Sequence, residues 1–366
     1  MLTNEQRIDP WLLGVFVALV SSGFLIFLSA SVGLIAREGA SFGQVALTRL
    51  AAVALGATAA YLLSRLNYKL VRRFALPLLI FSVLLSLLVF LPGVGVAHGG
   101  ARRWIGAFGL TFQPSELLKI AFVVYAAAFF SGVKERISSF SFGLLPLLIL
   151  LSLAGVLLLL EPDTDTFVVL FVALLAIFFT AGGRLKQLGL LCLVAAVALG
   201  SLIAMRPYLK ERFLTFINPG KDPQGAGYQI EQSLIAIGSG GFFGRGFGQS
   251  VQKFSYLPEP IGDSIFAVAG EEFGFFGASL LILLFLAFLL RGLRVAARAP
   301  DSFARLLTVG IVILIGASAF INIASMLGLI PLSGLTLPLV SHGGSALVIT
   351  LASAGVILNL SRYQKI

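Results

Sequence analysis

Long apolar runs separated by short polar segments make up most of the chain. A helix that crosses the apolar core of a bilayer needs about 20 mainly apolar residues. About ten runs approach or exceed that length: residues 11–36, 44–63, 74–96, 115–131, 143–160, 164–181, 188–205, 263–290, 304–327 and 343–360. The first run is too long for the core of a signal peptide and lacks a convincing cleavage site, so we expect it to be retained.

The pattern therefore predicts an all-α polytopic membrane protein with about ten transmembrane helices. Residues 1–366 are expected to form a single domain. Composition agrees, because 58% of the residues are hydrophobic and only 11% are charged, which excludes a water-soluble globular domain of this length. The single cysteine, Cys192, rules out a disulfide within the chain, and we expect it to be a packed thiol.

One polar segment is much longer than the others. Residues 206–262 are rich in glycine and precede the eighth predicted span, and their length favours a functional loop over a simple connection. Its glycines could form backbone nests for phosphate or a flexible re-entrant segment. They do not follow a dinucleotide-binding or Walker pattern, so no nucleotide cofactor is expected.

Lysine and arginine residues favour one side of the predicted bundle. That side receives Arg7, the 65–73 linker, Lys134 and Arg136, Arg184 and Lys186, the 291–305 segment, Arg362 and Lys365. Cytoplasmic loops are enriched in these residues, so both termini are expected in the cytoplasm and the 206–262 loop outside. The basic residues form short clusters between apolar runs, which indicates topology signals and not nucleic-acid binding, despite the net charge of +10.

Asp263 lies where the long polar loop meets the eighth apolar run. Unpaired N–H groups and the positive dipole end of a helix could keep this carboxylate ionised at the membrane boundary. An anchored carboxylate is a candidate general base or a ligand of a divalent cation. Simple capping of the helix is the alternative reading.

Further charged residues enter the predicted spans on the same outer side. Glu116 and Lys119 are three residues apart, which places them on one helical face as an ion pair or as a substrate site. Arg102 and Arg103 precede them and suit a diphosphate, with lipid headgroups as the alternative. Asp163 begins another span and could ligate a cation, whereas we expect Asp165 to cap the helix.

These residues lie in motifs that resemble, in order, those of the SEDS family. The motifs cover nearly the whole chain: Arg103-Trp-Ile, Gln113-Pro-Ser-Glu-Leu-Leu-Lys119, Glu161-Pro-Asp163, Gly227-Tyr-Gln, Gln232-Ser, Tyr256-Leu-Pro-Glu-Pro-x-x-Asp263 and Pro331-x-x-Gly334-x-x-x-Pro338-x-x-Ser341-x-Gly-Gly-Ser345. The segment Gly248-Gln-Ser-x-Gln-Lys253 resembles the FtsW division branch more than the RodA elongation branch. The chain departs from the family where Ile261-Gly precedes Asp263 in place of His-Thr, and where Thr164-Asp165 replaces Leu-Gly.

The resemblance implies a peptidoglycan glycosyltransferase that polymerises lipid II at the outer face of the bacterial cytoplasmic membrane, for septal cell-wall synthesis in cell division, with a class B penicillin-binding protein as partner. By motif match, Asp263 falls on the aspartate to which the family's catalysis is assigned. Glu116 and Lys119 fall on its functional charged pair. Gln232, Ser233 and Ser341 fall on motif positions expected to bind substrate.

The implied reaction is attack of a sugar hydroxyl on an anomeric carbon that carries undecaprenyl diphosphate. We expect Asp263 to act as the base or as a ligand of Mg²⁺ or Mn²⁺, with Arg102, Arg103 and Lys119 holding the diphosphate. The apolar spans would contact membrane lipids and the polyprenyl tail. The alternatives are a lipid II flippase, a RodA-type glycosyltransferase for cell elongation and shape, and a non-catalytic scaffold.

Overall fold

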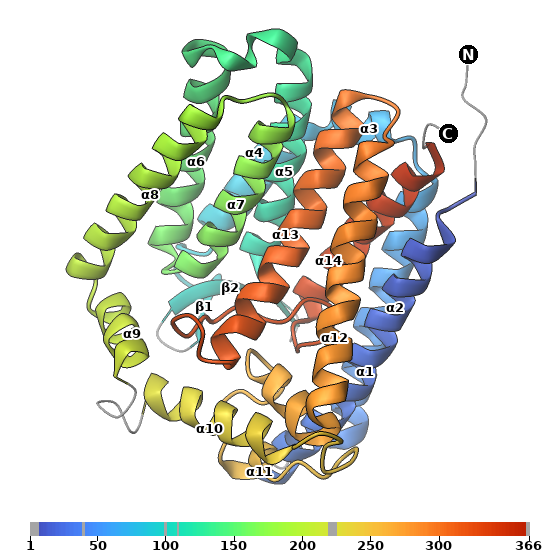
Figure 1. Cartoon of the computed structure of the whole chain (residues 1–366), viewed down its shortest axis with the longest axis vertical. Helices are drawn as coiled ribbons and strands as arrows, with labels where there is room; N and C mark the ends of the chain where they lie inside the picture. The colour runs from blue at the N-terminus through green and yellow to red at the C-terminus, as the bar shows by residue number, and fades with distance from the viewer. Residues whose placement is uncertain (1–6, 39–40, 99–100, 108–109, 219–224, 364–366) are drawn as a thin grey trace.

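The computed structural model describes residues 7–38, 41–98, 101–107, 110–218 and 225–363. Its long apolar helices follow the predicted order (Figure 1). They are α1 (Pro10–Glu38), α2 (Phe42–Arg65), α4 (Ala75–Leu88), α5 (Pro114–Val133), α6 (Leu145–Leu160), α7 (Thr164–Thr180), α8 (Leu185–Met205), α12 (Ile265–Ala297), α13 (Ser302–Met326) and α14 (Gly344–Leu360). Among the described residues, 8 helices are long and apolar enough to cross a membrane, and α4 and α7 are shorter apolar helices. The predicted polytopic helical bundle is confirmed.

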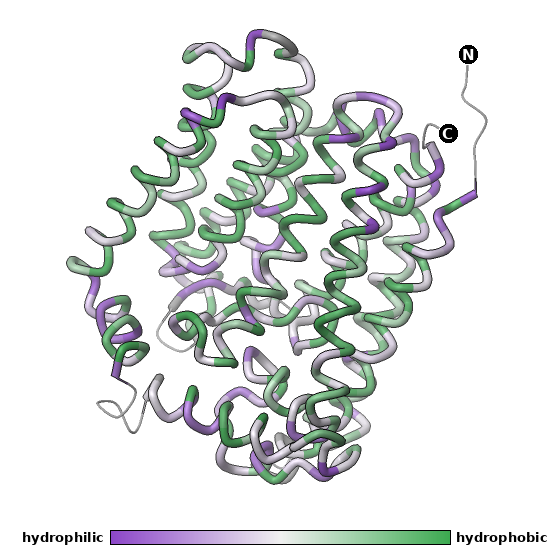
Figure 2. The backbone as a smooth tube through the Cα atoms, in the orientation of Figure 1, coloured by the Kyte–Doolittle hydropathy of each residue, from purple (hydrophilic) through white to green (hydrophobic). Residues whose placement is uncertain are grey.

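Helix α13 lies at the centre of the bundle and α8 at its edge. In the most apolar window of α13, 78% of the residues are buried, against 6% in that of α8. Figure 2 shows hydrophobic residues along most of the length of the helices, with hydrophilic ones gathered mainly toward their ends. The expectation of a packed thiol at Cys192 is wrong, because Cys192 is exposed on the weakly packed helix α8.

The third predicted span is shorter than the sequence pattern suggested. Helix α4 ends at Leu88, and residues that were expected to continue it to position 96 turn into strand β1 (Gly95–His98). Pro92 and Gly93 interrupt the apolar run, and Gly93 adopts a φ of 80°, which favours glycine. Strand β1 pairs with β2 (Ala101–Ala107), which pairs with β3 (Leu110–Phe112), in an antiparallel three-stranded sheet. This small sheet adds to the all-α fold.

The long polar segment is folded. Its described residues form α9 (Pro207–Ile217), α10 (Ala226–Ser239) and α11 (Gln252–Ser255). Figure 1 shows these helices at one end of the bundle, while α1 begins and α14 ends at the other. The short helix α3 (Tyr68–Arg73) lies at that second end. The arrangement agrees with the prediction that this segment lies on one side of the bundle, and that the start of α1 and the end of α14 both lie on the other side.

Helix α12 is interrupted at Gly274, whose φ is 65°. The glycine-rich chain after α10 runs beside this break and supplies the missing backbone partners: Arg245 N–H donates to the Glu271 carbonyl at 3.0 Å, and Phe275 N–H donates to the Gly241 carbonyl at 2.8 Å. Only a residue without Cβ fits this crossing, since a Cβ on Gly244 would lie 2.1 Å from the Glu272 carbonyl oxygen. These glycines therefore allow the chain after α10 to pack closely against the break in α12.

Glu271 and Glu272 of α12 also bind the polar segment that precedes Asp263. Lys253 Nζ lies 2.7 Å from Glu272 Oε1, and both side chains are fully buried. Ser250 Oγ donates to Glu271 Oε2 at 2.5 Å. The buried charges are paired, as low-dielectric surroundings require, so Glu271 and Glu272 have a structural role in holding the segment that precedes Asp263.

Candidate functional site

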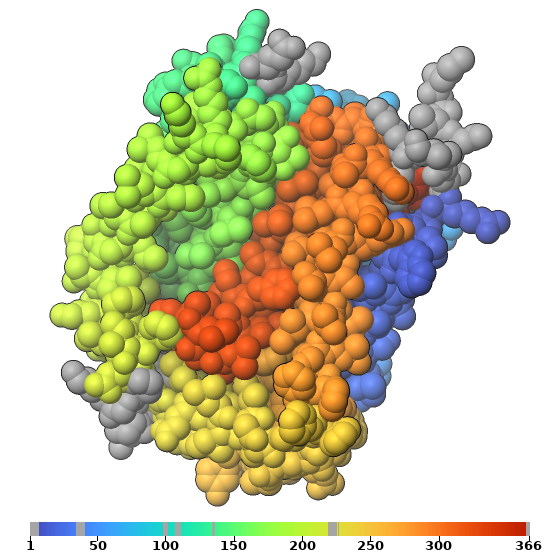
Figure 3. Space-filling model, viewed as in Figure 1, coloured from blue at the N-terminus to red at the C-terminus, as the bar shows by residue number. Residues whose placement is uncertain are grey.

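A cavity opens between the small sheet, the start of α5 and the connection between α13 and α14. That connection reaches the surface between α9 and α12 in Figure 3. The wider part of the cavity measures about 470 Å³ and is lined by, among others, Arg103, Gln113, Glu259, Asp263 and His342. A narrower part of about 70 Å³ is lined by Glu116, Lys119, Asp163 and Ser341 among others. Arg103, Gln113 and Thr336 line both parts, so the two adjoin.

Asp263 lies in the wall of the wider chamber, one residue before the N-cap of α12. Its Oδ1 accepts hydrogen bonds from Gln229 Nε2 at 3.0 Å and from Ser264 Oγ at 3.4 Å. The N-cap residue of α12 is Ser264, and no side chain caps the helix there. The capping alternative for Asp263 is therefore wrong, and its carboxylate is available for another role.

The surroundings of Asp263 bring its titration close to neutral pH. Burial raises the pKa of its carboxyl from 3.8 to about 7, Glu259 adds to the rise, and the hydrogen bonds from Gln229 and Ser264 oppose it. A group with a pKa near the working pH is suited to proton transfer, because both its forms are populated. A perturbed carboxyl in a cavity wall is a candidate general base.

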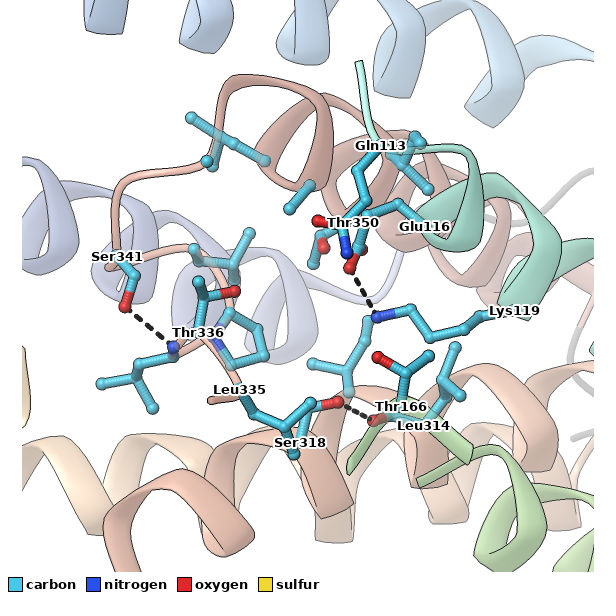
Figure 4. Close-up of a pocket in the computed structure, with 18 of the residues that line it drawn as sticks. Gln113, Glu116, Lys119, Thr166, Leu314, Ser318, Leu335, Thr336, Ser341 and Thr350 are labelled. Atoms are coloured by element: carbon cyan, nitrogen blue, oxygen red, sulfur yellow. Dashed lines mark hydrogen bonds and ion pairs between the residues drawn. The ribbon is translucent and has the colours of Figure 1, made fainter. Parts of the chain in front are cut away.

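Glu116 and Lys119 form the predicted ion pair on the first turns of α5. Lys119 Nζ lies 2.8 Å from Glu116 Oε1, and the two residues are 8% and 9% exposed. Figure 4 shows the Lys119 side chain extended toward Glu116, with Gln113 and Thr350 beside the carboxylate. Both line the narrow chamber. The charges are thus paired, nearly buried and in contact with the cavity.

The two arginines of β2 differ in position. Arg103 lines both chambers and donates from Nε to the Glu161 carbonyl at 2.9 Å and from Nη2 to the Pro162 carbonyl. Arg102 is exposed and lines neither chamber. The pairing of β2 with β1 is irregular here, since Val96 lies opposite Trp104 and Ala97 lies opposite Arg102, which leaves Arg103 as an extra residue. Such an irregularity can redirect a side chain, and Arg103 is the arginine that reaches the cavity.

At the start of α7, Asp163 caps the helix and Asp165 does not. Asp163 is the N-cap of α7: its Oδ1 accepts from Thr166 N–H at 3.3 Å, and Ser115 Oγ donates to its Oδ2 at 3.4 Å. Asp165, which we expected to cap, instead accepts from Arg212 Nη1 at 3.0 Å and from Gly334 N–H at 3.0 Å. Asp165 therefore joins α9 to the cavity-lining connection.

Ser341 lies in the narrow chamber, as its predicted contact with substrate requires. Its hydroxyl accepts from Leu337 N–H at 2.8 Å. Gln232 and Ser233 lie on α10 and line neither chamber. Ser233 is fully buried and donates to the Gln229 carbonyl at 2.7 Å. Substrate binding by Gln232 and Ser233 stays a prediction, and the structure places both apart from these chambers.

Three residues to which the sequence analysis gave no role of their own hold the site together. Arg49, about two turns into α2, is 3% exposed and donates to the carbonyls of Leu339, Val340 and Ser341 at 2.7–3.0 Å. Asn322 on α13 donates to the Asp263 carbonyl at 2.8 Å, and Gln229 binds the Asp263 side chain. A polar residue inside an apolar span is a signal of function or of structural pairing, and Arg49 and Asn322 both carry it.

The carboxylates of the cavity do not form a closed metal site by themselves. Within the parts of the chain that the structure describes, no group of three or more His, Cys, Asp or Glu side chains could hold a metal ion. Asp263 shares its chamber with Glu259 and His342, and His342 is stacked on Phe27 with ring centroids 5.8 Å apart. Mg²⁺ is often held by one or two carboxylates together with substrate phosphates, so a cation at Asp263 stays a prediction.

Comparison with known proteins places the chain among cell-cycle membrane proteins. The family model of cell cycle proteins named for FtsW, RodA and SpoVE matches residues 10–366. Stage V sporulation protein E of Bacillus subtilis is 37% identical over 365 residues, which is 100% of both chains. The probable peptidoglycan glycosyltransferase FtsW of Trichlorobacter lovleyi is 40% identical over 98% of this chain and 94% of its own.

Solved structures agree. A chain from a peptidoglycan synthase complex, studied for the coordination of polymerization and crosslinking, matches with a TM-score of 0.80 at 29% identity over 98% of this chain and 99% of its own. The rod shape determining protein RodA of Thermus thermophilus matches with a TM-score of 0.72 at 28% identity over 99% of this chain and 100% of its own.

Proposed function

The chain belongs to the FtsW/RodA/SpoVE family of SEDS proteins, and we propose that it is a peptidoglycan glycosyltransferase that polymerises lipid II into glycan strands. One observation carries the chemistry: a carboxyl group with a pKa near 7 lies in the wall of a cavity that also contains a buried lysine and an arginine. Glycosyl transfer to a hydroxyl needs a base for the acceptor and positive charge near the departing diphosphate. The cavity brings these groups together.

In the proposed reaction, the ionised Asp263 carboxylate takes the proton of an acceptor sugar hydroxyl. The hydroxyl oxygen forms a bond to the anomeric carbon of the donor, and the bond from that carbon to the diphosphate oxygen breaks. The electron pair leaves with undecaprenyl diphosphate. Lys119 and Arg103 stabilise the negative charge of the diphosphate, since ammonium and guanidinium groups match phosphate oxygens.

Glu116 has a supporting role in this scheme. Its carboxylate lies 2.8 Å from Lys119 Nζ, so it pairs with the ammonium group and orients it in a nearly buried place. Arg103 is oriented by the Glu161 and Pro162 carbonyls, which bind part of its guanidinium and leave further N–H groups for substrate. Arg102 is proposed to act at the exposed margin, on lipid headgroups.

No step of the scheme is routed through a cation. Mg²⁺ or Mn²⁺ at Asp263 or Asp163 is the other option, in which one of these carboxylates and the substrate diphosphate would hold the ion between them. Polymerisation in the presence of EDTA separates the two. A rate that persists would support Asp263 as the base without a cation, and a loss that Mg²⁺ or Mn²⁺ restores would support the metal-ligand role.

The chain is a multi-pass membrane protein, and its sidedness is part of the proposal. We propose that both termini are cytoplasmic and that α9–α11 and the cavity mouth face outward. Support comes from the lysine and arginine distribution and from the opposite placement of these elements in the bundle (Figure 1). Lipid II polymerised at this face would be available to an external transpeptidase.

We propose a class B penicillin-binding protein as that partner and septal synthesis during cell division as the setting. The complex similar to this chain is a peptidoglycan synthase that coordinates polymerization with crosslinking. FtsW relatives match at 35–40% identity, whereas the RodA structure matches at 28%. The elongation role of a RodA-type enzyme is the alternative that localisation in dividing cells would separate.

Purified protein incubated with lipid II tests the activity directly. We expect glycan strands that grow with time and disappear in Asp263→Asn. This substitution removes proton acceptance at nearly constant size, so we expect the rate to fall by about a hundredfold or more. Transport of labelled lipid II across vesicles without polymer formation would instead favour the flippase, and partner recruitment with neither activity would favour the scaffold.

A further inference from the structure

Gln229 donates a hydrogen bond to the Asp263 carboxylate from a different helix. It lies on α10, and its Nε2 donates to Asp263 Oδ1 at 3.0 Å and to Ser264 Oγ at 3.0 Å. A glutamine amide has two N–H donors, so it can make both bonds at once. Gln229 does not line the chamber into which Asp263 opens. It contacts the carboxylate without lying in the wall that faces substrate.

The main chain around Asp263 is held by other residues. Asn322 Nδ2 donates to the Asp263 carbonyl at 2.8 Å and to the Leu335 carbonyl at 2.7 Å. His342 N–H donates to the Ile261 carbonyl at 2.6 Å. These bonds fix where the aspartate leaves the backbone. They do not restrict rotation of the Asp263 carboxyl group, and Gln229 contacts that group.

The two carboxyl oxygens of Asp263 are not equivalent. Oδ1 accepts from Gln229 and from Ser264, whose hydroxyl is fully buried. Within the described part of the chain, no hydrogen bond to Oδ2 is found. One oxygen is therefore anchored, and the other is available to the chamber. This is the arrangement that a directed base requires, because proton transfer depends on the orientation of the accepting oxygen.

We propose that Gln229 is a positioning residue for glycosyl transfer, which anchors Asp263 Oδ1 so that Oδ2 takes the proton of the acceptor hydroxyl. The inference rests on the proposed function, since it concerns the base of that reaction. It also makes α10 part of the catalytic apparatus, although α10 belongs to the outer segment and not to a membrane span. A shift of α10 would then change the base directly.

A purely structural role, in which Gln229 pins α10 to α12, is the competing explanation. The opposite end of α10 is already held by close packing, because a Cβ on Gly240 would lie 2.1 Å from the Gly270 carbonyl oxygen and one on Gly270 would meet Ile237 Cγ1 at 2.9 Å. The backbone bonds from Arg245 and Gly246 to α12 add to this attachment. Docking of α10 thus does not depend on the Gln229 amide.

The test compares Gln229→Met with Glu231→Met in the purified full-length protein acting on lipid II. Methionine matches glutamine in length and removes both donors, whereas Glu231→Met introduces the same side chain at an exposed position of α10. We expect Gln229→Met to lower kcat by about tenfold or more, because a misdirected catalytic group is costly. We expect KM and the thermal midpoint to stay close to wild type, and Glu231→Met to change none of the three.

Gln229→Glu is the second variant, in case the methionine variant is unstable. It keeps the size of the side chain but replaces the donor with an oxygen, so it should lower kcat at least as much. Wild-type kcat in either folded variant would overturn the inference. A variant whose KM rises and whose thermal midpoint falls together with kcat would also overturn it, because that result indicates a structural role. Asp263→Asn is measured beside them: full activity there would refute the proposed base itself, whereas inactivity there with a normal Gln229→Met enzyme would refute only the positioning role.

Discussion

Reversing the ion pair of α5 separates its contribution to stability from its contribution to catalysis. Glu116 and Lys119 are 9% and 8% exposed, with Nζ and Oε1 2.8 Å apart. In Lys119→Ala the Glu116 carboxylate is left nearly buried without its cation, and losing one partner of a buried pair costs about 3–5 kcal/mol. We therefore expect the thermal midpoint and the polymerisation rate of this variant to fall together.

The doubly reversed variant, Glu116→Lys with Lys119→Glu, keeps opposite charges three residues apart on one face. It places the cation nearer the helix N-terminus, which costs only about 0.3–1 kcal/mol through the helix dipole. Most of the lost stability should return. The ammonium, however, then extends from position 116 and not from position 119, so it meets the narrow chamber, which both residues line, at a different point. The rate should therefore stay low.

Thermal unfolding in detergent and lipid II polymerisation on the same preparations give the two readouts. Glu116→Gln serves as the matched control, because it retains the shape of the pair and the Lys119 charge. If the doubly reversed protein regains wild-type turnover along with its stability, the pair is purely structural, and Lys119 does not bind the diphosphate. Wild-type turnover in folded Lys119→Ala would contradict both roles.

Other consequences can be measured on the same protein. Since the Asp263 carboxyl has a pKa raised to about 7 and acts only when ionised, kcat should fall about tenfold for each pH unit below that value and level off above it; a flat profile between pH 5 and 8 would exclude this base. With the native thiol removed by Cys192→Ser, Glu231→Cys on α10 should react with an impermeant maleimide in intact cells, and labelling only after lysis would reverse the proposed sidedness. Arg49→Lys should lower thermal stability by about 1–3 kcal/mol and slow polymerisation, because an ammonium cannot reproduce the fork that meets three carbonyls; an unchanged enzyme would show that the cavity-lining connection needs no such support.

The sequence by itself determined the class of fold and the order of the spans. In a bilayer the backbone must satisfy its hydrogen bonds within each helix, so apolar length along the chain is enough to locate most spans. The same locality explains the ion pair of α5, since residues three apart on a helix meet without reference to the rest of the fold. The prediction from apolar length was wrong for the third span. There the chain turns at Pro92 and Gly93 into a sheet, and the short strands of this sheet show little hydrophobic periodicity.

The tertiary structure decided which charged residues share a cavity and what each one contacts. Asp263 is oriented by Gln229 and Asn322, 34 and 59 positions away, and Arg49 reaches Ser341 across 292 positions. Sequence spacing carries no information about such contacts, because they depend on how separate helices pack. The roles of Asp163 and Asp165 differ for a related reason: both stand at the same helix start, and only the position of Arg212 and Gly334 beside α7 determines which acid is left to cap it.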